Sequence, residues 1–498
     1  MVLFNRLLLY CFLLVSLSCC ESDKLSSDDS EQKRILSKIN RNDLSIFKQG
    51  LIKSEQNVIE QLPDAPIYHI ELEIPDSFSP IRCSQQVNYI NLENKPLNDI
   101  YLRFYHNPMP YYTAYVKEVK VNGEEVEQKF EFSGSMMRVE LPKVLKEGEE
   151  VLVDIKFEAE IKVRKGGEFY GLFGYLSGIL LLDKFYPAVQ VYNENGWNRG
   201  GFNKLGDMSF LDASYYIVQV TAPSELQFVT SGIEISSKVE ASKQVVKFAA
   251  GPIRDFYLAA SDRFITQSDT FNETVINSYA FESRKRGAKT ALKTSMKAMK
   301  YFKKIFGDYP YTEFDIVSVP MLFGGMEYPG VIALAYSKYD HDYKEELINV
   351  TVHEVAHQWF YNVVGNDQEE EPWIDEALAQ YCTMMYLRDK VGISRAEDYI
   401  KYDLYKRWDR VNLAVIPIGM STDSYTPREY TSIVYGRGPI FILNLEEVMG
   451  VRSFYNFLND YYTSNKWGIV TTEIFKNTAE KHCNCDLTDL FIEWIYKD

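Results

Sequence analysis

The stretch from Thr351 to Ala379 constrains the fold of this chain more than any other. It begins with the letters T-V-H-E-V-A-H-Q-W-F and ends with P-W-I-D-E-A-L-A. His353 and His357 are four positions apart, so a helix here carries both imidazoles on one face. Glu354 lies beside them, turned away from that face and within reach of a water molecule next to a metal. The stretch therefore predicts a helix, a short loop and a second helix around one metal ion.

A third acidic residue indicates the kind of metal site. Eighteen residues lie between His357 and Glu376, enough to finish one helix, turn, and present a carboxylate from the next. Two histidines and one glutamate are the ligand set of an open catalytic zinc site, which keeps its fourth position for water. H-E-x-x-H alone is a short pattern that also occurs by chance, but W-I-D-E-A at this distance favours the catalytic interpretation. We therefore predict a single zinc ion on His353, His357 and Glu376.

Length and charge limit what surrounds this site. The chain has 498 residues, 46% hydrophobic and 25% charged, which is the balance of a globular protein of two or three domains. Its formal net charge of −16 argues against nucleic acid as a partner. The 36 tyrosines fit a strand-rich structure better than the alternative, a carbohydrate-binding surface.

The first residues are predicted to direct export. Arg6 precedes the mostly apolar run from Leu7 to Leu17, which is too short to cross a bilayer as a mature helix and is typical of a signal peptide. Leu17-Ser18-Cys19-Cys20 resembles the cleavage box of bacterial lipoproteins, in which the cysteine becomes the acylated first residue. Residues 1–19 would then be a signal peptide, and residues 20–62 a tether and N-terminal helical segment. An ordinary secretory signal with cysteines by chance is the alternative.

This segment also sets the expected location of the protein. We expect a lipid-anchored protein at the cell surface or on a membrane facing the periplasm, and otherwise a secreted one. The sequence does not distinguish which of Cys19 and Cys20 carries the lipid, and it leaves the oligomeric state open.

Four cysteines follow the signal segment. Cys83 and Cys382 are isolated in the sequence and are predicted to be small buried side chains. The run His482-Cys483-Asn484-Cys485 suggests a second metal site, but no further cluster would complete it. Export permits disulfides, although nothing in the sequence demands one.

Hydrophobic periodicity divides the rest of the chain into two domains. Asn122-Gly123 predicts a hairpin turn. We expect an α+β fold, with a mostly antiparallel β domain at 63–262 and a mainly helical, catalytic domain at 263–498. Alternating or apolar runs predict the strands of the first domain at 68–74, 86–92, 100–104, 116–121, 129–132, 137–141, 151–157, 215–220, 226–230 and 245–249.

The pattern becomes helical in the second domain. An apolar stripe from Ala288 to Ile305 predicts a helix that Gly307 ends. Pro372 is expected in the first turn of the second metal-binding helix, where its missing N–H costs nothing. The remaining expected elements are strands at 314–320 and 331–336, the first metal-binding helix at 343–364, and a mostly helical segment at 395–498 that is broken at 415–428.

The stretch from Gly166 to Asp207 combines many glycines with aromatic residues such as Tyr175, Tyr186 and Trp197. It is either an irregular loop packed by its own aromatic side chains or a wall of the substrate cleft. The sequence leaves both interpretations open.

Further segments stand in a specific order along the chain. They are R-D-F at 254–256, G-D-Y-P-Y at 307–311, G-G-M-E-Y-P-G at 324–330 and V-Y-G-R-G at 434–438. Together with H-E-V-A-H-Q-W-F and W-I-D-E-A-L-A, they resemble the gluzincin zinc aminopeptidases related to aminopeptidase N and leukotriene hydrolase. G-G-M-E-Y-P-G resembles the exopeptidase motif of that family, and V-Y-G-R-G resembles the segment with its catalytic tyrosine. The resemblance covers roughly residues 60 to 498.

The resemblance implies an N-terminal β domain followed by a thermolysin-like zinc peptidase domain. It implies that Glu354 is the general base, that Tyr435 stabilises the oxyanion and that Glu327 binds the α-amine of a peptide substrate. The glycines beside Glu327 would let the substrate backbone lie close. The expected substrate-binding residues are Gly324, Gly325, Met326 and Glu327.

The sequence departs from the family pattern in several places. Tyr328 stands where the family usually has asparagine, and Arg437 stands where it usually has lysine, so Arg437 is expected to be structural. The acidic Pro-Cys motif of the β domain is absent, and Phe185-Tyr186-Pro187 and Gly206-Asp207 occupy that region. The helical C-terminal domain of larger relatives is also missing, so an open cleft that admits longer peptides is expected.

We therefore expect an exported zinc metallopeptidase that removes N-terminal residues from peptides. Two rival functions are an endopeptidase or other hydrolase on the same zinc site, and a surface binding lipoprotein that kept the fold without turnover. Glu327 and Tyr435 have simpler explanations as a surface carboxylate and a packed tyrosine. The side-chain preference at the substrate's N-terminus is not predicted.

Overall fold

The computed structural model describes residues 43–108, 112–164, 173–200, 205–207 and 209–496. Leu44–Asp498 form one compact unit. The predicted signal peptide, Cys19 and Cys20 lie outside the described residues. Within the described ranges, no helix has the length and apolar character needed to span a membrane.

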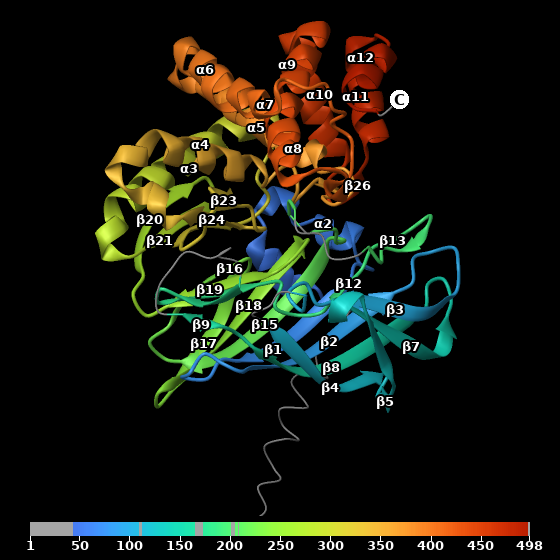
Figure 1. Cartoon of the computed structure of the whole chain (residues 1–498). Helices are drawn as coiled ribbons and strands as arrows, with labels where there is room; N and C mark the ends of the chain where they lie inside the picture. The colour runs from blue at the N-terminus through green and yellow to red at the C-terminus, as the bar shows by residue number, and fades with distance from the viewer. Residues whose placement is uncertain (1–42, 109–111, 165–172, 201–204, 208, 497–498) are drawn as a thin grey trace, which may run out of the picture. The chain divides into compact units, whose positions relative to one another are not determined.

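An eight-stranded sheet forms the base of the β domain (Figure 1). Neighbouring strands are antiparallel except β1 and β15, which are parallel. In β8, buried and more exposed residues alternate along the strand, so one face of the sheet packs inward. In order across the sheet, the strands are β17 (Ile233–Glu240), β18 (Lys243–Ile253), β15 (Ser214–Pro223), β1 (Ile67–Glu73), β2 (Ile81–Ile90), β8 (Glu150–Glu160), β4 (Thr113–Val121) and β5 (Glu124–Glu125).

Smaller sheets complete this domain. One has the order β12 (Ala188–Val189), β3 (Leu97–Arg103), β7 (Met136–Leu145) and β6 (Gln128–Glu131). The other has the order β16 (Gln227–Thr230), β19 (Tyr257–Ser261), β11 (Ile179–Asp183), β10 (Phe173–Leu176) and β9 (Val163–Arg164), and a hairpin joins β13 (Tyr192–Asn193) to β14 (Gly196–Trp197). Gln85 of the large sheet donates a hydrogen bond of 2.9 Å to the carbonyl of Pro187, so the segment at 185–187 belongs to the core.

A second five-stranded sheet begins the catalytic domain. Its order is β20 (Ile265–Phe271), β21 (Thr274–Ala280), β22 (Glu313–Val319), β24 (Val331–Ala335) and β23 (Gly325–Met326), so β23 lies at an edge. The helices α3 (Lys285–Ile305) and α4 (Lys344–Ala356) pack against each other beside it. Gly307 has φ 130° just after α3, a conformation that glycine adopts without strain, so it ends the helix as predicted.

Helices dominate the rest of the chain, and Figure 1 shows them gathered at the side of the unit away from the large sheet. The mostly helical C-terminal segment is therefore confirmed. The helices are α5 (Trp373–Tyr386), α6 (Ile393–Tyr399), α7 (Lys406–Trp408), α8 (Pro427–Ser432), α9 (Gly438–Met449), α10 (Val451–Ser464), α11 (Thr472–Cys483) and α12 (Thr488–Trp494).

The α+β fold, with an antiparallel β domain before a helical region, is confirmed, and each predicted strand overlaps an observed one. Asn122 and Gly123 have φ of 50° and 87° and join β4 to β5 in a tight hairpin, as predicted. The division at residue 262 stays a prediction. The pattern missed several strands. Among them are β17 and β20, whose exposed faces carry polar side chains without strict alternation, and β19, whose residues are all buried.

Two helical predictions were too long. The first metal-binding helix ends at Ala356 rather than Val364, because the chain leaves the helical path and Tyr361 adopts φ 127°. Before β1, the described residues form only short turns, namely η1 (Ser45–Gly50), η2 (Lys53–Glu55) and α2 (Val58–Gln61).

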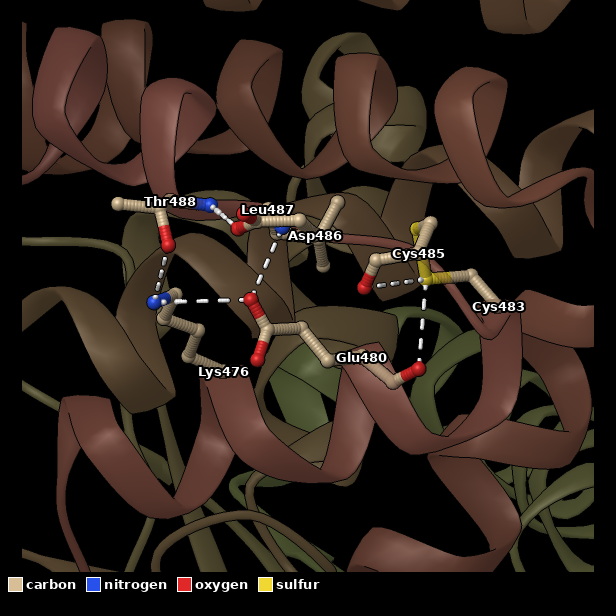
Figure 2. The surroundings of a disulfide bond; sticks show 7 residues. All are labelled: Lys476, Glu480, Cys483, Cys485, Asp486, Leu487 and Thr488. Atoms are coloured by element: carbon tan, nitrogen blue, oxygen red, sulfur yellow. Dashed lines mark hydrogen bonds and ion pairs between the residues drawn. A yellow bond between two sulfur atoms is a disulfide. The ribbon is translucent and has the colours of Figure 1, made fainter.

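The C-terminal cysteines form a disulfide that the sequence did not demand. Cys483 and Cys485 are bonded to each other at the end of α11 (Figure 2), so their sulfurs are not available to a metal. His482 contacts Asp460 at 2.8 Å instead. The disulfide thus rules out the alternative of a metal site on these two cysteines, which the sequence had not favoured. Cys83 and Cys382 are free and buried as predicted.

Candidate active site

The predicted metal ligands come together at the end of α4 and the start of α5. The Nε2 atoms of His353 and His357 are 3.2 Å apart. Oε2 of Glu376 lies 3.2 Å from Nε2 of His353 and 3.6 Å from Nε2 of His357. A tetrahedral zinc ion with bonds of about 2.0–2.1 Å separates its ligand atoms by about 3.3–3.4 Å. The three donors therefore fit one zinc ion without rearrangement.

The surroundings of these donors also fit a metal. Nδ1 of His357 is 3.1 Å from the carbonyl oxygen of Phe360, which can accept its proton and leave Nε2 free as a ligand. Nδ1 of His353 and Oε2 of Glu376 are buried without a hydrogen-bond partner among the described residues. An unpartnered buried carboxylate oxygen is costly, and a cation at this point would satisfy it.

Glu354 lies on α4 beside the ligands and points at the same space. Its carboxylate is buried, and Oε2 has no hydrogen-bond partner among the described residues. A Cβ on Gly325 would lie 2.4 Å from Oε1 of Glu354, so only glycine lets β23 approach α4 this closely. Gly324 similarly faces Val350 of α4 at 3.0 Å. The close approach of the helix thus requires Gly325 and leaves little space at Gly324, a reason that the sequence did not indicate.

Glu327 follows the edge strand β23 and is buried beside the metal ligands. Its carboxylate oxygen lies within 4.8 Å of ligand atoms of His357 and Glu376. Nε2 of Gln368 donates to Oε1 of Glu327 at 3.2 Å and to Asp375 at 2.7 Å. No lysine or arginine is paired with Glu327 among the described residues, so its negative charge faces the site unmatched.

Tyr435 lies on the π-helical turn η11 (Ile433–Arg437). Its hydroxyl donates a hydrogen bond of 2.5 Å to Oε1 of Glu376, and its ring lies 6.4 Å from that of His353. Turns of this kind widen a helix locally and are frequent at functional sites. The structure thus brings Tyr435 to the metal ligands from a distant part of the chain.

Asp207 is a further carboxylate of the site that was not predicted from the sequence. Asp207 is half-buried, and its pKa is raised well above the usual range by removal from water and then by the charges of Glu327 and Glu376. Burial and the charge of Glu327 likewise raise the pKa of Glu354. Asp207 follows Gly206 in the glycine-rich stretch, and that Gly-Asp pair was its only sequence signal. The negative charges of these acidic groups together favour the binding of cations in the site.

The aromatic stretch at 166–207 contains the strands β10 to β14, so its interpretation as an irregular loop is wrong. Phe185 and Tyr186 are nevertheless fully buried in the core. Asp183, Lys184 and Asp207 line a cavity together with Glu327 and Tyr328, and the interpretation of the stretch as a wall of the substrate cleft stays a prediction. Residues 165–172 and 201–204 of this region lie outside the described ranges.

Arg254 and Asp255 hold Tyr361 at both ends. Nε of Arg254 donates to the carbonyl of Tyr361 at 2.8 Å, and the Tyr361 hydroxyl donates to Asp255. Arg254 also donates to the carbonyls of Leu211 and Gly468. A β-domain segment thereby holds the strained turn that follows the metal-binding helix. The R-D-F segment was noted in the sequence, but this role was not.

Arg437 is structural, as expected. Its guanidinium is buried, donates to the carbonyls of Ile416, Glu493 and Trp494 at 2.8–3.1 Å, and lies 4.4 Å from the ring centre of Trp494. It connects the last helix to the segment that carries Tyr435.

Comparison with known proteins agrees with this geometry. Residues 290–494 match the model of the peptidase family M1 domain. The chain is 23% identical over 397 residues to the leukotriene A-4 hydrolase of Xenopus laevis, covering 72% of this chain and 60% of that protein. It is 23% identical over 278 residues to aminopeptidase 2 of Candida albicans, covering 52% of this chain and 30% of that one. The chain thus spans less than two thirds of these relatives.

Solved structures show the same fold. An M1 zinc metallopeptidase from Deinococcus radiodurans superposes with a TM-score of 0.65 at 15% identity, covering 87% of this chain and 94% of that one. The chain therefore has the fold of this metallopeptidase, with a β domain before the helical domain. Residues 290–494 are similar to the peptidase family M1 domain, and the donor atoms of His353, His357 and Glu376 fit a single zinc ion.

Proposed function

We propose that this protein is a zinc aminopeptidase that removes N-terminal residues from peptides, with zinc held by His353, His357 and Glu376. The observation that supports it best is an unmatched carboxylate, Glu327, beside a complete set of zinc ligands. An exopeptidase must bind the positively charged N-terminus of its substrate next to the hydrolytic metal, and a carboxylate at this place can do so. The family of the catalytic domain and the aminopeptidases among its relatives support the same function.

Each side chain then has a chemical task. When bound, zinc polarises the scissile carbonyl and lowers the pKa of water. Glu354 accepts the proton of the attacking water and passes it to the leaving amine. Tyr435 donates its hydroxyl proton to the oxygen on which negative charge develops, and so stabilises the transition state more than the ground state.

Glu327 sets the position of the substrate. Its buried carboxylate pairs with the α-ammonium group in a charge-assisted contact. Gly325 and Met326 lie in β23, an edge strand whose free side offers backbone groups to an extended peptide. These contacts place the first peptide bond, rather than an internal one, at the metal.

The central experiment measures hydrolysis of aminoacyl anilides by zinc-loaded protein. We expect cleavage that chelators stop and that Glu354→Gln abolishes while the variant keeps its zinc, as measured by metal analysis. An equally active Glu354→Gln protein would contradict the mechanism. Glu345 is an exposed residue on the same helix, so Glu345→Gln is the matched control and is expected to stay fully active.

An endopeptidase on the same site is the second candidate, because the three zinc ligands and Glu354 would serve an internal peptide bond equally well. Peptides with free and acetylated N-termini separate the two functions. We expect acetylation to block cleavage, since it removes the charge that Glu327 binds. Equal rates on both peptides would favour the endopeptidase. No cleavage of any peptide would favour a surface binding protein without turnover.

We also propose export and lipid anchoring through Cys19 or Cys20. The support is sequence alone, namely the apolar run at residues 7–17 and the Leu-Ser-Cys-Cys segment. We expect the protein in the membrane fraction, resistant to salt and released by detergent. Replacing both cysteines by serine should release it, and a variant that stays with the membrane would contradict lipidation.

A further inference from the structure

We propose that the exposed face of helix α3 binds the anionic headgroups of a lipid membrane by electrostatic attraction. We call this surface the basic face, and its residues are Arg286, Lys289, Lys293, Lys297, Lys300 and Lys304. None of them has a task in the mechanism above. The inference goes beyond the proposed hydrolysis and adds a second attachment to the proposed lipid anchor.

The charge of α3 differs from that of the rest of the chain. Its 21 residues include eight of the 54 lysines and arginines and no aspartate or glutamate, although the whole chain has a formal net charge of −16. At 3.6 residues per turn, the six exposed residues of the basic face lie within an arc of about 80° and extend over about 27 Å along the helix. They therefore form one continuous positive surface.

Neighbouring acidic residues do not neutralise the basic face. Lys285 and Lys303 flank it and pair with Glu282 and Asp308. The six residues of the basic face have no ion pair with any residue that the structure describes. Like charges four residues apart on a helix repel each other and destabilise it. An anionic partner is therefore favoured at this surface, because it relieves the repulsion.

The side chains of the basic face fit a lipid surface better than a folded protein. Five of the six are lysines, whose hydrated ammonium groups attract anions without a fixed geometry. α3 is described in full and exposes no large apolar side chain, whereas protein interfaces are centred on aromatic and arginine anchors. Clusters of about four to eight basic residues on an amphipathic helix are typical of binding to anionic lipids.

The N-terminal segment enters the compact unit beside the end of α3. The amide of Ile52 donates to the carbonyl of Pro310 at 2.9 Å, and the amide of Thr312 donates to the carbonyl of Gly50 at 3.0 Å. Pro310 follows Ile305, the last residue of α3, by five positions. A lipid anchor earlier in this segment would keep the basic face near the membrane and raise the effective concentration of headgroups around it.

The two attachments differ in strength. Electrostatic attraction to a surface is screened by salt, so the basic face alone is not expected to hold the protein on a washed membrane. A lipid anchor together with a basic surface gives a more stable attachment than either alone. The variant without Cys19 and Cys20 is therefore still expected to leave the membrane at ordinary ionic strength.

Binding through the basic face leaves the active site accessible. The buried face of α3 packs on α4, β20 and β21 (Figure 1). The site residues come from α4, α5, η11 and the segment that includes β23. The hydrolysis of soluble substrates should therefore not depend on the lysines of the basic face.

Vesicle binding tests the inference without the lipid anchor. The full chain with Cys19→Ser and Cys20→Ser is mixed at low ionic strength with vesicles of phosphatidylcholine, either alone or with an equal part of phosphatidylglycerol. We expect binding to the anionic vesicles to be stronger by at least about 10-fold and to weaken as salt is added. Equal binding to both kinds of vesicle would overturn the inference. Anilide hydrolysis by the same sample tests the proposed function separately.

Removal of charge from α3 tests the place of binding. The triple variant Lys289→Gln, Lys293→Gln and Lys297→Gln should bind anionic vesicles at least about 10-fold more weakly, since each lysine near such a surface adds to the attraction. It should hydrolyse soluble anilides as fast as the parent protein, which shows that it is folded. Unchanged vesicle binding by this active variant would contradict the role of α3.

A matched control separates the basic face from the net charge. The triple variant Lys129→Gln, Lys143→Gln and Lys238→Gln changes the net charge by the same amount at exposed positions of the β domain. It should keep the parent protein's affinity for anionic vesicles. An equal loss of affinity in both triple variants would show that binding follows total charge, and it would overturn the inference.

An acidic protein partner is the other possible occupant of the basic face, and soluble polyglutamate is the probe for it. Binding of polyglutamate that is lost in the α3 triple variant, without a preference for anionic vesicles, would assign the face to such a partner. That result would overturn the membrane inference. A preference for anionic vesicles that is lost in the same variant supports the inference.

Discussion

Two clusters of buried charge meet at Glu327, and their charges are balanced in different ways. On the metal side, Glu327, Glu354 and Glu376 surround two histidines, and no lysine or arginine pairs with these carboxylates within the described residues. On the β-domain side, Lys184 lies between Asp183 and Asp255. Burial opposes the charge of Lys184, but the two carboxylates outweigh it and raise its pKa.

The contrast separates a reactive region from a shaping one. Unmatched carboxylates in a buried place favour incoming cations, here zinc and the α-ammonium group of a substrate. A buried ion pair whose charges cancel attracts a charged ligand only weakly. It resists displacement because separating buried charges raises the free energy strongly. One cluster therefore supplies the chemistry, and the other fixes the space next to it.

The largest expected effect is on the metal side. His357→Ala should lose zinc and reduce kcat/KM by about 10³-fold or more, since a catalytic metal supplies several kcal/mol of transition-state stabilisation. Metal analysis of the purified variant and anilide hydrolysis check this. His482→Ala removes a histidine that pairs with Asp460 elsewhere in the same domain, and it should keep the zinc. Zinc retained at full stoichiometry by His357→Ala would refute the ligand assignment.

Removing the cation from the cluster of Lys184, Asp183 and Asp255, the matched cluster, should lower the stability of the protein more than its catalytic rate. Lys184→Met leaves Asp183 and Asp255 buried without their cation and should lower the free energy of unfolding by about 3–5 kcal/mol. Urea unfolding measures the change. Lys129→Met breaks the exposed pair with Glu140, whose side chains are 59% and 53% exposed, and should cost less than about 1 kcal/mol. If both variants lost a similar amount of unfolding free energy, the buried cluster around Lys184 would not be held more firmly than an exposed ion pair.

Tyr435→Phe tests whether the metal side stabilises developing charge. The variant should lower kcat by about 10²-fold with little change in KM, because the lost hydrogen bond forms in the transition state. Steady-state kinetics on an alanyl anilide measure both constants. Tyr425→Phe, a nearby tyrosine that donates to the Pro417 carbonyl, should change kcat by much less. An effect on KM alone would place Tyr435 in substrate binding instead.

The smallest expected effect is the pH dependence of stability that comes from His106, which lies beside the matched cluster. Burial, and then the charge of Lys184, lower the pKa of His106 from 6.5 to about 3, and its Nε2 contacts the Asp183 carbonyl oxygen at 2.6 Å. Because the unfolded chain binds the proton first, this histidine's contribution is complete above about pH 6.5 and is lost as pH falls towards 3.

The loss should be about 1.4 kcal/mol per pH unit below 6.5, and so about 2 kcal/mol between pH 6.5 and pH 5. His106→Gln should remove this part of the slope in urea unfolding. The exposed His341 provides the control, since His341→Gln should keep the wild-type slope. Identical slopes for the wild-type protein and His106→Gln would show that His106 does not titrate in this way.

The sequence was most informative where the decisive contacts are local. The spacing of His353, His357 and Glu376 depends on helical geometry over a few residues, and the structure brings the three side chains together as that spacing requires. The hairpin at Asn122-Gly123 and the end of α3 at Gly307 depend on backbone conformations that particular residue types favour. Glu327 and Tyr435 were identified only through the family resemblance, because no local pattern connects them to the metal.

Tertiary structure decided what lies next to the metal. Lys184, Asp207 and Tyr328 come from three separate segments, and nothing in their periodicity predicts that they share one cavity. The short α4 and the strained Tyr361 depend on Arg254, more than a hundred residues earlier in the chain. The sequence by itself thus determined the metal ligands, since their spacing is local. The charge balance and the size of the neighbouring cavity depend on packing between distant segments, which no local pattern records.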